Sequence, residues 1–348
     1  MTLVSVIGNF FSSVAPVFYD FFDEIDTHII ISDDSKRDSK RARMFKKGVA
    51  DFCKHKKDLS QHFVRIDEDS DTAIRKVCDY VLKHASGNIY VNVTDGLATI
   101  NTLMSLNLLN KGVKFISYDI FDNEYHIIDK SGIVKRKKAN SMNIKEHFML
   151  KGYKINDYEN MDFAIINKKS ILELFDRFFD EFNEFKKSLT ENTLKLDKYP
   201  NVVRILRKLG FDMNFKNLKV NQKTITGSLF EMYVYLKVKE LGFDDVMSGA
   251  VIEINGIKNE FDLLLMKDNH LHVVECKFKN INKKNLEMLL YKYALLKEIL
   301  DYDSKAFIIS NDEITEGYAN RAKSYNLKLI NSRSDITTEI SEFLKVES

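Results

Sequence analysis

Tryptophan is absent from this chain of 348 residues, and proline and cysteine are scarce, with two and three residues. Cys53, Cys78 and Cys276 lack the spacing of metal ligands, and an odd number in a chain without a secretion signal indicates reduced thiols. Met1 to Gly8 is predicted to be a first strand, so we expect a cytoplasmic protein. No apolar run approaches the roughly 20 residues that span a bilayer, which predicts no membrane contact.

A strong charge of one sign is also missing, because 53 Lys and Arg against 51 Asp and Glu leave a net charge of +2. This value says little about partners. The content of 44% apolar and 30% charged residues is that of a soluble globular protein and excludes disorder of the whole chain. The length allows two domains with separate cores.

The amino-terminal half alternates apolar strands with helices. Such alternation predicts βαβ units and a parallel sheet covered on both faces, which is a Rossmann-like α/β domain. The dinucleotide fingerprint Gly-x-Gly-x-x-Gly is absent. The strands are expected at 3–7, 28–32, 63–66, 88–93 and 113–118, and the helices at 14–24, 35–54, 71–84 and 97–110.

Ligands of such sheets bind beyond the carboxyl ends of the strands. Exposed amides and hydroxyls in these loops suit phosphates or ribose, although helix capping is the alternative for Ser and Thr. The helix after Ser32 is locally basic and would attract a polyanion, unless it is merely solvated. The candidate ligand-binding residues are Gly8, Asn9, Ser12, Ser32, Asp33, Lys36, Asn92, Thr94, Asp95 and Gly96.

In the carboxy-terminal half, two apolar runs, 261–266 and 271–276, flank a polar connection and predict a β-hairpin. A connection of even length sets Asp262 opposite Glu275 and Glu260 opposite Lys277, so all four side chains share one face. The alternative is a pair of cross-strand salt bridges on a solvated face.

Two facing carboxylates on apolar strands repel each other unless a proton or a cation lies between them. Mg²⁺ or Mn²⁺ prefers oxygen ligands and keeps several waters. We therefore predict a metal site formed by Asp262, Glu275 and the backbone carbonyl of Cys276, whose thiol is expected in the core. Lys277 would orient the attacking water or stabilise charge on a phosphate, and Glu260 would modulate Lys277.

An Asp on one strand followed by Glu-x-Lys on the next resembles the motif of PD-(D/E)XK nucleases, the restriction-endonuclease-like superfamily. The flanking order of helix, strands, helix and strand agrees with this resemblance, with helices expected at 225–241, 285–299 and 316–325 and strands at 306–310 and 327–331. The resemblance implies that Glu231, on the first of these helices, assists at the metal site, although an ordinary solvated residue is the alternative. Tyr291 and Lys292 lie where they could approach the nucleic-acid backbone, with packing or solvation as the alternative.

A Rossmann-like domain before a PD-(D/E)XK domain resembles the CRISPR-associated ancillary nucleases with a CARF domain, and among them the family once called domain of unknown function 1887. The segment Asn-Ile-Lys-Glu-His-Phe-Met-Leu-Lys-Gly-Tyr at 143–153 is similar to one that follows the sensor domain there. Where the family commonly has Gly-Gly-Thr-Lys after its Asn-x-Thr, this chain has Asp95-Gly96-Leu97-Ala98 and lacks the lysine.

The resemblance implies a homodimeric, metal-dependent endonuclease of type III CRISPR antiviral defence. Its activator would be a cyclic oligoadenylate, first of all cyclic tetra-adenylate, and its substrate DNA, RNA or both. Two alternatives remain open: a repair or restriction-type nuclease whose amino-terminal half recognises DNA, and a nucleotide-sensing regulator without activity.

An apolar stripe along a single helix expected at 170–189 would pack in the core, with part of it available between subunits. A break near Pro200 and a short helix ending at Gly210 follow it. We predict three parts, namely a CARF-like sensor domain at 1–145, a helical connector at 146–215 and the nuclease domain at 216–348.

Overall fold

The computed structural model describes residues 1–8, 11–33, 36–66, 70–254, 256–278, 287–293, 296, 304–311 and 314–345, without the side chains of residues 11 and 36–38. Asn9, the side chain of Lys36 and, within the helix predicted at 285–299, residues 285, 286, 294, 295 and 297–299 lie outside this description. The chain forms two compact units. The amino-terminal unit comprises Met1–Asn156, Ile252–Asn259 and Met266–Leu271, and the carboxy-terminal unit comprises Asp157–Val251, Glu260–Leu265 and His272–Ser348.

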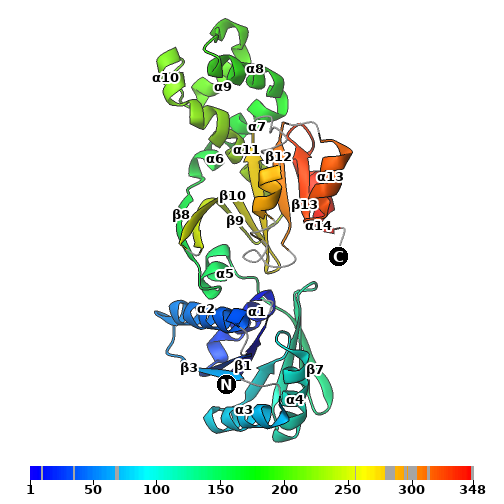
Figure 1. The fold of residues 1–348 in the computed structure, drawn as a ribbon. Coiled ribbons are helices and arrows are strands. Elements are labelled where there is room, and N and C mark those ends of the chain that lie inside the picture. Colours follow the sequence, from blue (N-terminus) through cyan, green and yellow to red (C-terminus); the bar gives the residue numbers. More distant parts are fainter. Residues whose placement is uncertain are drawn as a thin grey trace. The chain divides into compact units, whose positions relative to one another are not determined.

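A seven-stranded sheet in the order β3-β2-β1-β4-β5-β6-β7 organises the amino-terminal unit (Figure 1). The first five strands of this order are parallel, and the hairpin of β6 and β7 adds two antiparallel ones. The strands are β1 (Thr2–Ile7), β2 (Thr27–Asp33), β3 (Ser60–Ile66), β4 (Ile89–Asn92), β5 (Lys114–Asp119), β6 (Glu124–Asp129) and β7 (Gly132–Lys138).

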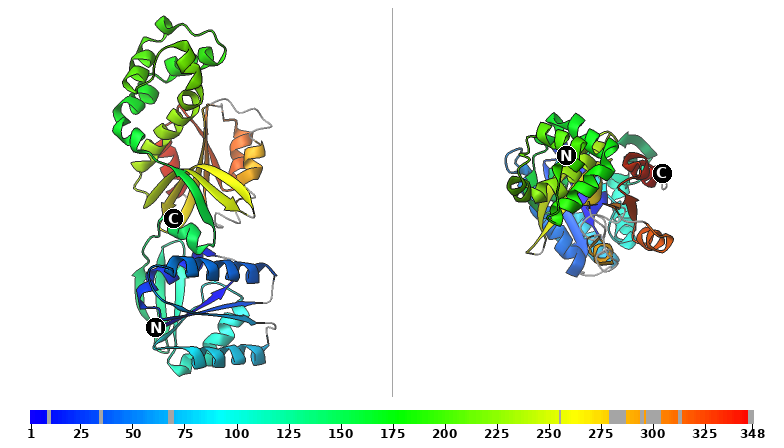
Figure 2. Two further views of the ribbon diagram at one scale, coloured as in Figure 1. Left: turned by 90° about the vertical axis from the view of Figure 1, so that its left-hand side faces the viewer. Right: turned by 90° about the horizontal axis from the view of Figure 1, so that it is seen from above.

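Helices cover both faces of this sheet, because β1 and β2 are apolar on both sides. The helices are α1 (Ala15–Asp20), α2 (Lys36–Cys53), α3 (Asp71–His84), α4 (Ala98–Leu108) and α5 (Ile144–Leu150). Phe18, Phe45 and Leu150 of α1, α2 and α5 lie in one core cluster, and Val77 and Met104 of α3 and α4 lie in another. Figure 2 (left) shows α2 and α3 on opposite sides of the sheet. The predicted α/β fold is confirmed.

A six-stranded sheet in the order β13-β12-β11-β10-β9-β8 organises the second half of the chain. Its strands are β8 (Lys154–Glu159), β9 (Asp245–Ile254), β10 (Ile257–Lys267), β11 (His270–Lys277), β12 (Ala306–Ser310) and β13 (Leu327–Asn331). The strands β11, β12 and β13 are parallel. The helices are α6 (Asp162–Ile166), α7 (Lys168–Arg177), α8 (Phe179–Thr190), α9 (Pro200–Lys208), α10 (Phe215–Val220), α11 (Leu229–Lys239), α13 (Glu316–Lys323) and α14 (Ile336–Lys345).

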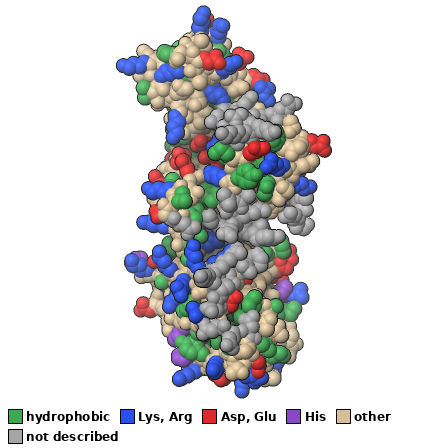
Figure 3. Space-filling view, in the orientation of Figure 1, with side chains coloured by type: hydrophobic (Ala, Val, Ile, Leu, Met, Phe, Trp, Pro, Cys, Tyr) green, Lys and Arg blue, Asp and Glu red, His purple; other side chains and the backbone are tan. Residues whose placement is uncertain are grey.

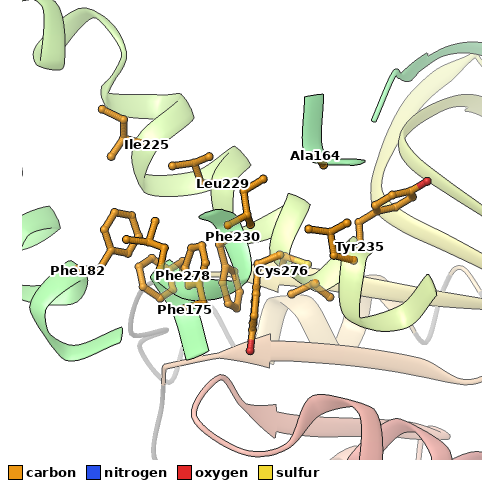
Figure 4. Close-up of a cluster of buried hydrophobic side chains, with 14 of the residues drawn as sticks. Ala164, Phe175, Phe182, Ile225, Leu229, Phe230, Tyr235, Cys276 and Phe278 are labelled. Atoms are coloured by element: carbon orange, nitrogen blue, oxygen red, sulfur yellow. The ribbon is translucent and has the colours of Figure 1, made fainter. Parts of the chain in front are cut away.

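The connector helices share a core with the strands of the predicted nuclease domain. Phe182 of α8 stacks on Phe278, which follows β11, and Phe175 of α7 packs edge-on against the same ring (Figure 4). The carboxy-terminal unit therefore begins at Asp157 and contains the connector helices together with most of the predicted nuclease domain. The helix predicted at 170–189 is two helices, because Phe178 leaves the helical conformation. Its apolar stripe is buried, which confirms core packing.

Within the described residues, none of the helices is long and apolar enough to cross a membrane.

Candidate functional site

The hairpin predicted around residue 268 is formed by β10 and β11. Asp268 and Asn269 make its two-residue turn and both have positive φ, 48° and 66°, as a type I′ turn requires. Asp and Asn tolerate this conformation better than most residues. A turn of two residues sets Asp262 opposite Glu275, as predicted from the even length of the connection.

Asp262, Glu275 and Lys277 come together on this hairpin. Lys277 Nζ lies 2.6 Å from Glu275 Oε1 and 3.4 Å from Asp262 Oδ2. Asp262 Oδ2 also accepts a hydrogen bond of 2.7 Å from the backbone N–H of Cys276. The thiol of Cys276 belongs to the hydrophobic cluster with Phe230 and Phe278, so only the Cys276 backbone faces the acids (Figure 4).

The helical residues 287–293 bring two further groups to Glu275. The Tyr293 hydroxyl donates a hydrogen bond to Glu275 Oε2, and Lys292 Nζ lies 3.4 Å from the same oxygen. Glu275 is only 4% exposed, and Tyr293 is 3% exposed. A buried carboxylate needs such donors to offset the loss of water. Glu275 Oε1 is therefore held by Lys277 on the same strand, and Oε2 is held by Tyr293 and Lys292 of the helical segment.

Burial and the neighbouring charges shift the pKa values of Asp262, Glu275 and Lys277. Burial, followed by the charge of Glu275, raises the pKa of Asp262. Burial also acts to raise the pKa of Glu275, but Lys277 and Lys292 outweigh it and lower this pKa. Burial opposes the charge of Lys277, yet the two carboxylates raise its pKa, so it remains an ammonium. The site thus keeps one firmly ionised carboxylate beside one that holds a proton more readily.

The surroundings of Glu231 and Glu260 differ from those of Asp262, Glu275 and Lys277. Glu231 lies in the first turn of α11, and burial, followed by the charges of Asp262 and Glu159, raises its pKa to about 7. Glu260 is exposed and forms no ion pair with a described residue. The predicted pairing of Glu260 with Lys277 is not formed, because Lys277 contacts the buried Glu275 and the half-buried Asp262, whose attraction is less screened by water.

The donor set of the site suits a hard divalent cation. Asp262 and Glu275 offer carboxylate oxygens, and Cys276 offers a backbone carbonyl. Over the part of the chain that the structure describes, no three His, Cys, Asp or Glu side chains gather as metal ligands. The residues therefore fit a cation held by two carboxylates and water, whereas Glu231 is not grouped with them as a third direct ligand.

A cleft of about 870 Å³ opens beside Lys277 in the same unit. A π-helical turn, Thr224–Ser228, leads into α11 here, and such turns are frequent at functional sites. Lys186 Nζ donates to the carbonyl of Phe278 and lies 3.9 Å from the centre of its ring. The lining residues are Asn183, Glu184, Lys186, Lys187, Thr190, Glu191, Gln222, Lys223, Thr226, Gly227, Glu231, Cys276, Lys277, Phe278 and Asn311.

The predicted ligand loops meet at one edge of the amino-terminal sheet. β1 lies between β2 and β4, and the order of the strands reverses between β1 and β4. The carboxyl ends of parallel strands at such a reversal are the usual binding crevice of open α/β sheets. Gly8, Ser32 and Asp33, together with Asn92 to Gly96, lie at these ends.

Two glycines allow the backbones after β1 and β4 to approach each other. A Cβ on Gly8 would lie 2.6 Å from Gly96 N, and one on Gly96, where φ is 90°, would lie 2.5 Å from a methyl of Val6. The Gly8 amide donates a hydrogen bond of 2.7 Å to Asp95 Oδ2. Asp95, which stands where the family pattern differs, thus ties the two loops together.

Asn92 and Thr94 form a second connection at this edge. Asn92 Oδ1 accepts from the hydroxyl of Thr94 at 2.6 Å, and Thr94 Oγ1 accepts from Tyr118 N at 2.8 Å. Thr94 does not cap α4, because Leu97 occupies the N-cap position of that helix. Likewise, the N-cap residue of α1 is Val14 and not Ser12. Among the residues that the structure describes, none is a hydrogen-bond partner of the buried Ser32 hydroxyl. Such a hydroxyl is available to a ligand.

The sequence patterns did not indicate a role for Tyr293, Lys186 or Asn269. Lys186 precedes Phe278 by 92 residues, so no local pattern connects them. Tyr293 follows the singled-out Lys292, and a helical spacing alone does not tell which of two neighbouring tyrosines points inward. Asn269 was part of the polar turn, where its residue type indicated only conformation.

Part of this chain matches a family model, and the whole chain is similar to solved structures. Residues 219–347 match the family model described as "Card1-like, endonuclease domain". No curated protein is a significant match to the sequence. Among solved structures, protein VC1899 from Vibrio cholerae is similar, with a TM-score of 0.79, 14% identity and coverage of 99% of this chain and 98% of that one.

Can2 from Sulfobacillus thermosulfidooxidans, solved in complex with cyclic tetra-adenylate, matches with a TM-score of 0.77, 14% identity and coverage of 99% of each chain. A type III CRISPR defence DNA nuclease activated by cyclic oligoadenylate matches with a TM-score of 0.56 and 11% identity, covering 98% of this chain and 51% of that one. These solved structures, at 11–14% identity, confirm the predicted fold of the chain. Residues 219–347 are thus similar to a Card1-like endonuclease domain, and the whole chain shares the fold of Can2.

Proposed function

We propose that this protein is a metal-dependent endonuclease of type III CRISPR defence that a cyclic oligoadenylate activates. The observation that carries the proposal is the buried group of Asp262, Glu275 and Lys277 beside the cleft, within the residues that match the endonuclease model. The printed descriptions of Can2 and of the DNA nuclease, which name cyclic tetra-adenylate and cyclic oligoadenylate, support the activator.

Lys277 is the residue best placed to act on the reacting phosphate. Its ammonium stays charged and lines the cleft, so it orients the attacking water or stabilises negative charge that develops on the phosphate oxygens. Tyr293 and Lys292 keep Glu275 in one orientation, which keeps Lys277 in position through their ion pair. Glu231, with its pKa near neutrality, is suited to exchange a proton with water in the cleft.

Asp262, Glu275 and the carbonyl of Cys276 would hold Mg²⁺ or Mn²⁺. When bound, such a cation supplies Lewis-acid stabilisation and lowers the pKa of water. The two carboxylates already lie on one face of the hairpin, although Lys277 partly offsets their charge. Glu231 would assist through water.

The substrate of this nuclease is DNA, RNA or both, and the cleft supports contact with a phosphate backbone. Lys187 and Lys223 line it and are exposed, and neither forms an ion pair with a described residue. Figure 3 shows further Lys and Arg side chains over the connector helices, with acidic ones among them. Cations without partners are available to phosphates.

The activator binds at the carboxyl ends of β1, β2 and β4. Backbone amides, the hydroxyls of Ser12, Ser32 and Thr94, and the amide of Asn92 suit the ribose and phosphate groups of cyclic tetra-adenylate. We also propose that the protein acts as a cytoplasmic homodimer, because a symmetric ring is best held by two copies of one sensor domain. Light scattering on the purified protein at several concentrations tests the dimer.

The decisive experiment measures cleavage of labelled single-stranded DNA and RNA in Mn²⁺ with a panel of cyclic oligoadenylates. We expect the parent to cleave rapidly only with the matching ring. Glu275→Ala removes the carboxylate at the centre of the site, and we expect cleavage to fall by at least about 10³-fold. Glu253→Ala, an exposed acid on the neighbouring strand β9, is the matched control and should cleave like the parent.

Retained cleavage in a folded Glu275→Ala variant would refute the site. Equal cleavage with and without every ring would refute activation and favour a repair or restriction-type nuclease. No cleavage by the parent, with binding of cyclic tetra-adenylate, would favour a regulator without activity.

A further inference from the structure

One residue in the turn of the hairpin that carries Asp262 and Glu275, Asn269, is buried within the amino-terminal unit. Residues Met266–Leu271 belong to that unit, whereas Glu260–Leu265 and His272–Lys277, on the same two strands, belong to the other. Asn269 at the turn is only 3% exposed. A polar turn residue is normally solvated, so its burial requires a partner for each polar atom.

Asn269 finds these partners among residues of the same unit. Its Oδ1 accepts from Met142 N at 2.8 Å, and its Nδ2 donates to Asn123 Oδ1 at 2.9 Å and to Asn140 O at 3.1 Å. His270 adds a contact of 2.6 Å between its Nε2 and the carbonyl of Ile120. The turn is therefore held from several sides.

Asn123 connects Asn269 to Tyr118 of β5 by hydrogen bonds. It is 1% exposed, and its Oδ1 also accepts from the Tyr118 hydroxyl at 2.7 Å, while its Nδ2 donates to Ala139 O at 3.1 Å. All the polar atoms of both amide side chains are thus used. Such fully satisfied buried networks have one good arrangement and resist partial change.

Tyr118 joins this network to the predicted ligand edge. Its hydroxyl contacts Asn123, and its backbone N–H donates to Thr94 Oγ1, which in turn donates to Asn92. A ligand that competes for the Thr94 hydroxyl or the Asn92 amide changes the partners of Tyr118. The buried contacts therefore run without a break from the ends of β4 to Asn269.

We propose that Asn269 is a positioning residue for the nuclease reaction, through which ligand contact at Asn92 and Thr94 reaches Asp262 and Glu275. Glu275 follows Asn269 by six residues of continuous strand, about 20 Å of stiff backbone. A displacement or a rotation of the turn changes the twist of both strands and hence the spacing of the two carboxylates. This inference rests on the proposed function.

The test removes single side chains from the network without changing the turn. Asn269→Gly deletes the amide and tolerates the φ of 66°, and Tyr118→Phe deletes only the hydroxyl. Asp268→Gly is the matched control, because Asp268 has a φ of 48° in the same turn but pairs with the exposed Lys138. The readout is the ratio of cleavage rates with and without cyclic tetra-adenylate in Mn²⁺, together with the affinity for the ring by calorimetry.

We expect the activation ratio to fall by at least about fivefold in Asn269→Gly and in Tyr118→Phe, with the ring still bound. The double variant should fall no further than the lower single one, because both substitutions interrupt one connection. Asp268→Gly should keep the ratio of the parent. A purely structural role would lower both rates together and leave the ratio unchanged.

An unchanged ratio in Asn269→Gly, or additive losses in the double variant, overturns the inference while leaving the proposed function intact. A parent that cleaves equally with and without every ring overturns both the activation and this inference. The cleavage rate of Glu275→Ala distinguishes these two outcomes from failure of the catalytic site, because retained cleavage in that variant would refute the site itself.

Discussion

Glu275 illustrates how one side chain depends on groups that are distant in sequence. Its two oxygens are held by Lys277 on the same strand and by Lys292 and Tyr293 on a helical segment. Tyr293→Phe keeps the ring in the core and removes one donor to a charged acceptor, which is worth about 1.5–3 kcal/mol. We expect kcat to fall by about 10- to 100-fold, with a smaller change in KM, in steady-state cleavage assays.

The control for this substitution is Tyr291→Phe, two residues earlier. Tyr291 is 55% exposed, and its hydroxyl lies 3.5 Å from Arg321. Its cleavage rate should equal that of the parent. Equal rates for both variants would contradict a positioning role for Tyr293.

Glu231 gives a prediction about pH. Its ordinary pKa is 4.5, and burial raises it to about 7 in the folded protein. Between these values the folded state keeps a proton that the unfolded state loses, so stability falls as pH rises through this window. Glu231→Gln cannot ionise, so we expect its gain in Tm over the parent, in EDTA, to be larger near pH ~8 than near pH ~4.5.

Calorimetric melting at both pH values checks this expectation, with the exposed Glu260→Gln on β10 as the control. A gain for Glu231→Gln that is the same at both pH values would contradict it. Adding Mn²⁺ should abolish the gain if Glu231 assists at the metal through water.

At the scale of elements, α8 and the π-helical turn before α11 form walls of the cleft. Lys187 lies on α8, and Lys223 directly precedes the π-helical turn. If they neutralise phosphates, Lys187→Gln and Lys223→Gln in the background of Glu275→Ala should each weaken binding of single-stranded DNA. We expect the slope of log K against log salt to decrease by about 0.7 for each lysine.

Fluorescence anisotropy at several salt concentrations measures this slope. Lys216→Gln is the control, since Lys216 is exposed on α10 and does not line the cleft. A slope that stays the same in both cleft variants would exclude these lysines from the interface.

Strands and turns that are specified by their own apolar and turn residues were predicted correctly. The hairpin around residue 268, β12 and β13 agree with their apolar runs and turn residues. The helix predicted at 170–189 was wrong as a single element, because α7 and α8 turn at Phe178 to bring both apolar faces into one core. The pattern of apolar residues shows which faces are buried, whereas the break depends on what they pack against.

At the scale of the whole molecule, the two units do not follow one another simply along the chain. Residues 252–259 and 266–271 return to the amino-terminal unit from within the second half of the sequence. Predicted borders at 145 and 215 assume continuous domains, and composition gives no indication of such a return. The strands that carry the catalytic candidates are thereby covalently shared by both units.

The sequence by itself determined the α/β fold, the hairpin and the one-sided placement of Asp262, Glu275 and Lys277, because strand alternation and turn length are local properties. Only the tertiary structure decided that Lys277 pairs with both carboxylates and not with Glu260, that Tyr293 and Lys186 approach from other helices, and that Asn269 is buried. Such contacts join residues far apart in the chain, and their strength depends on burial, which no local pattern contains.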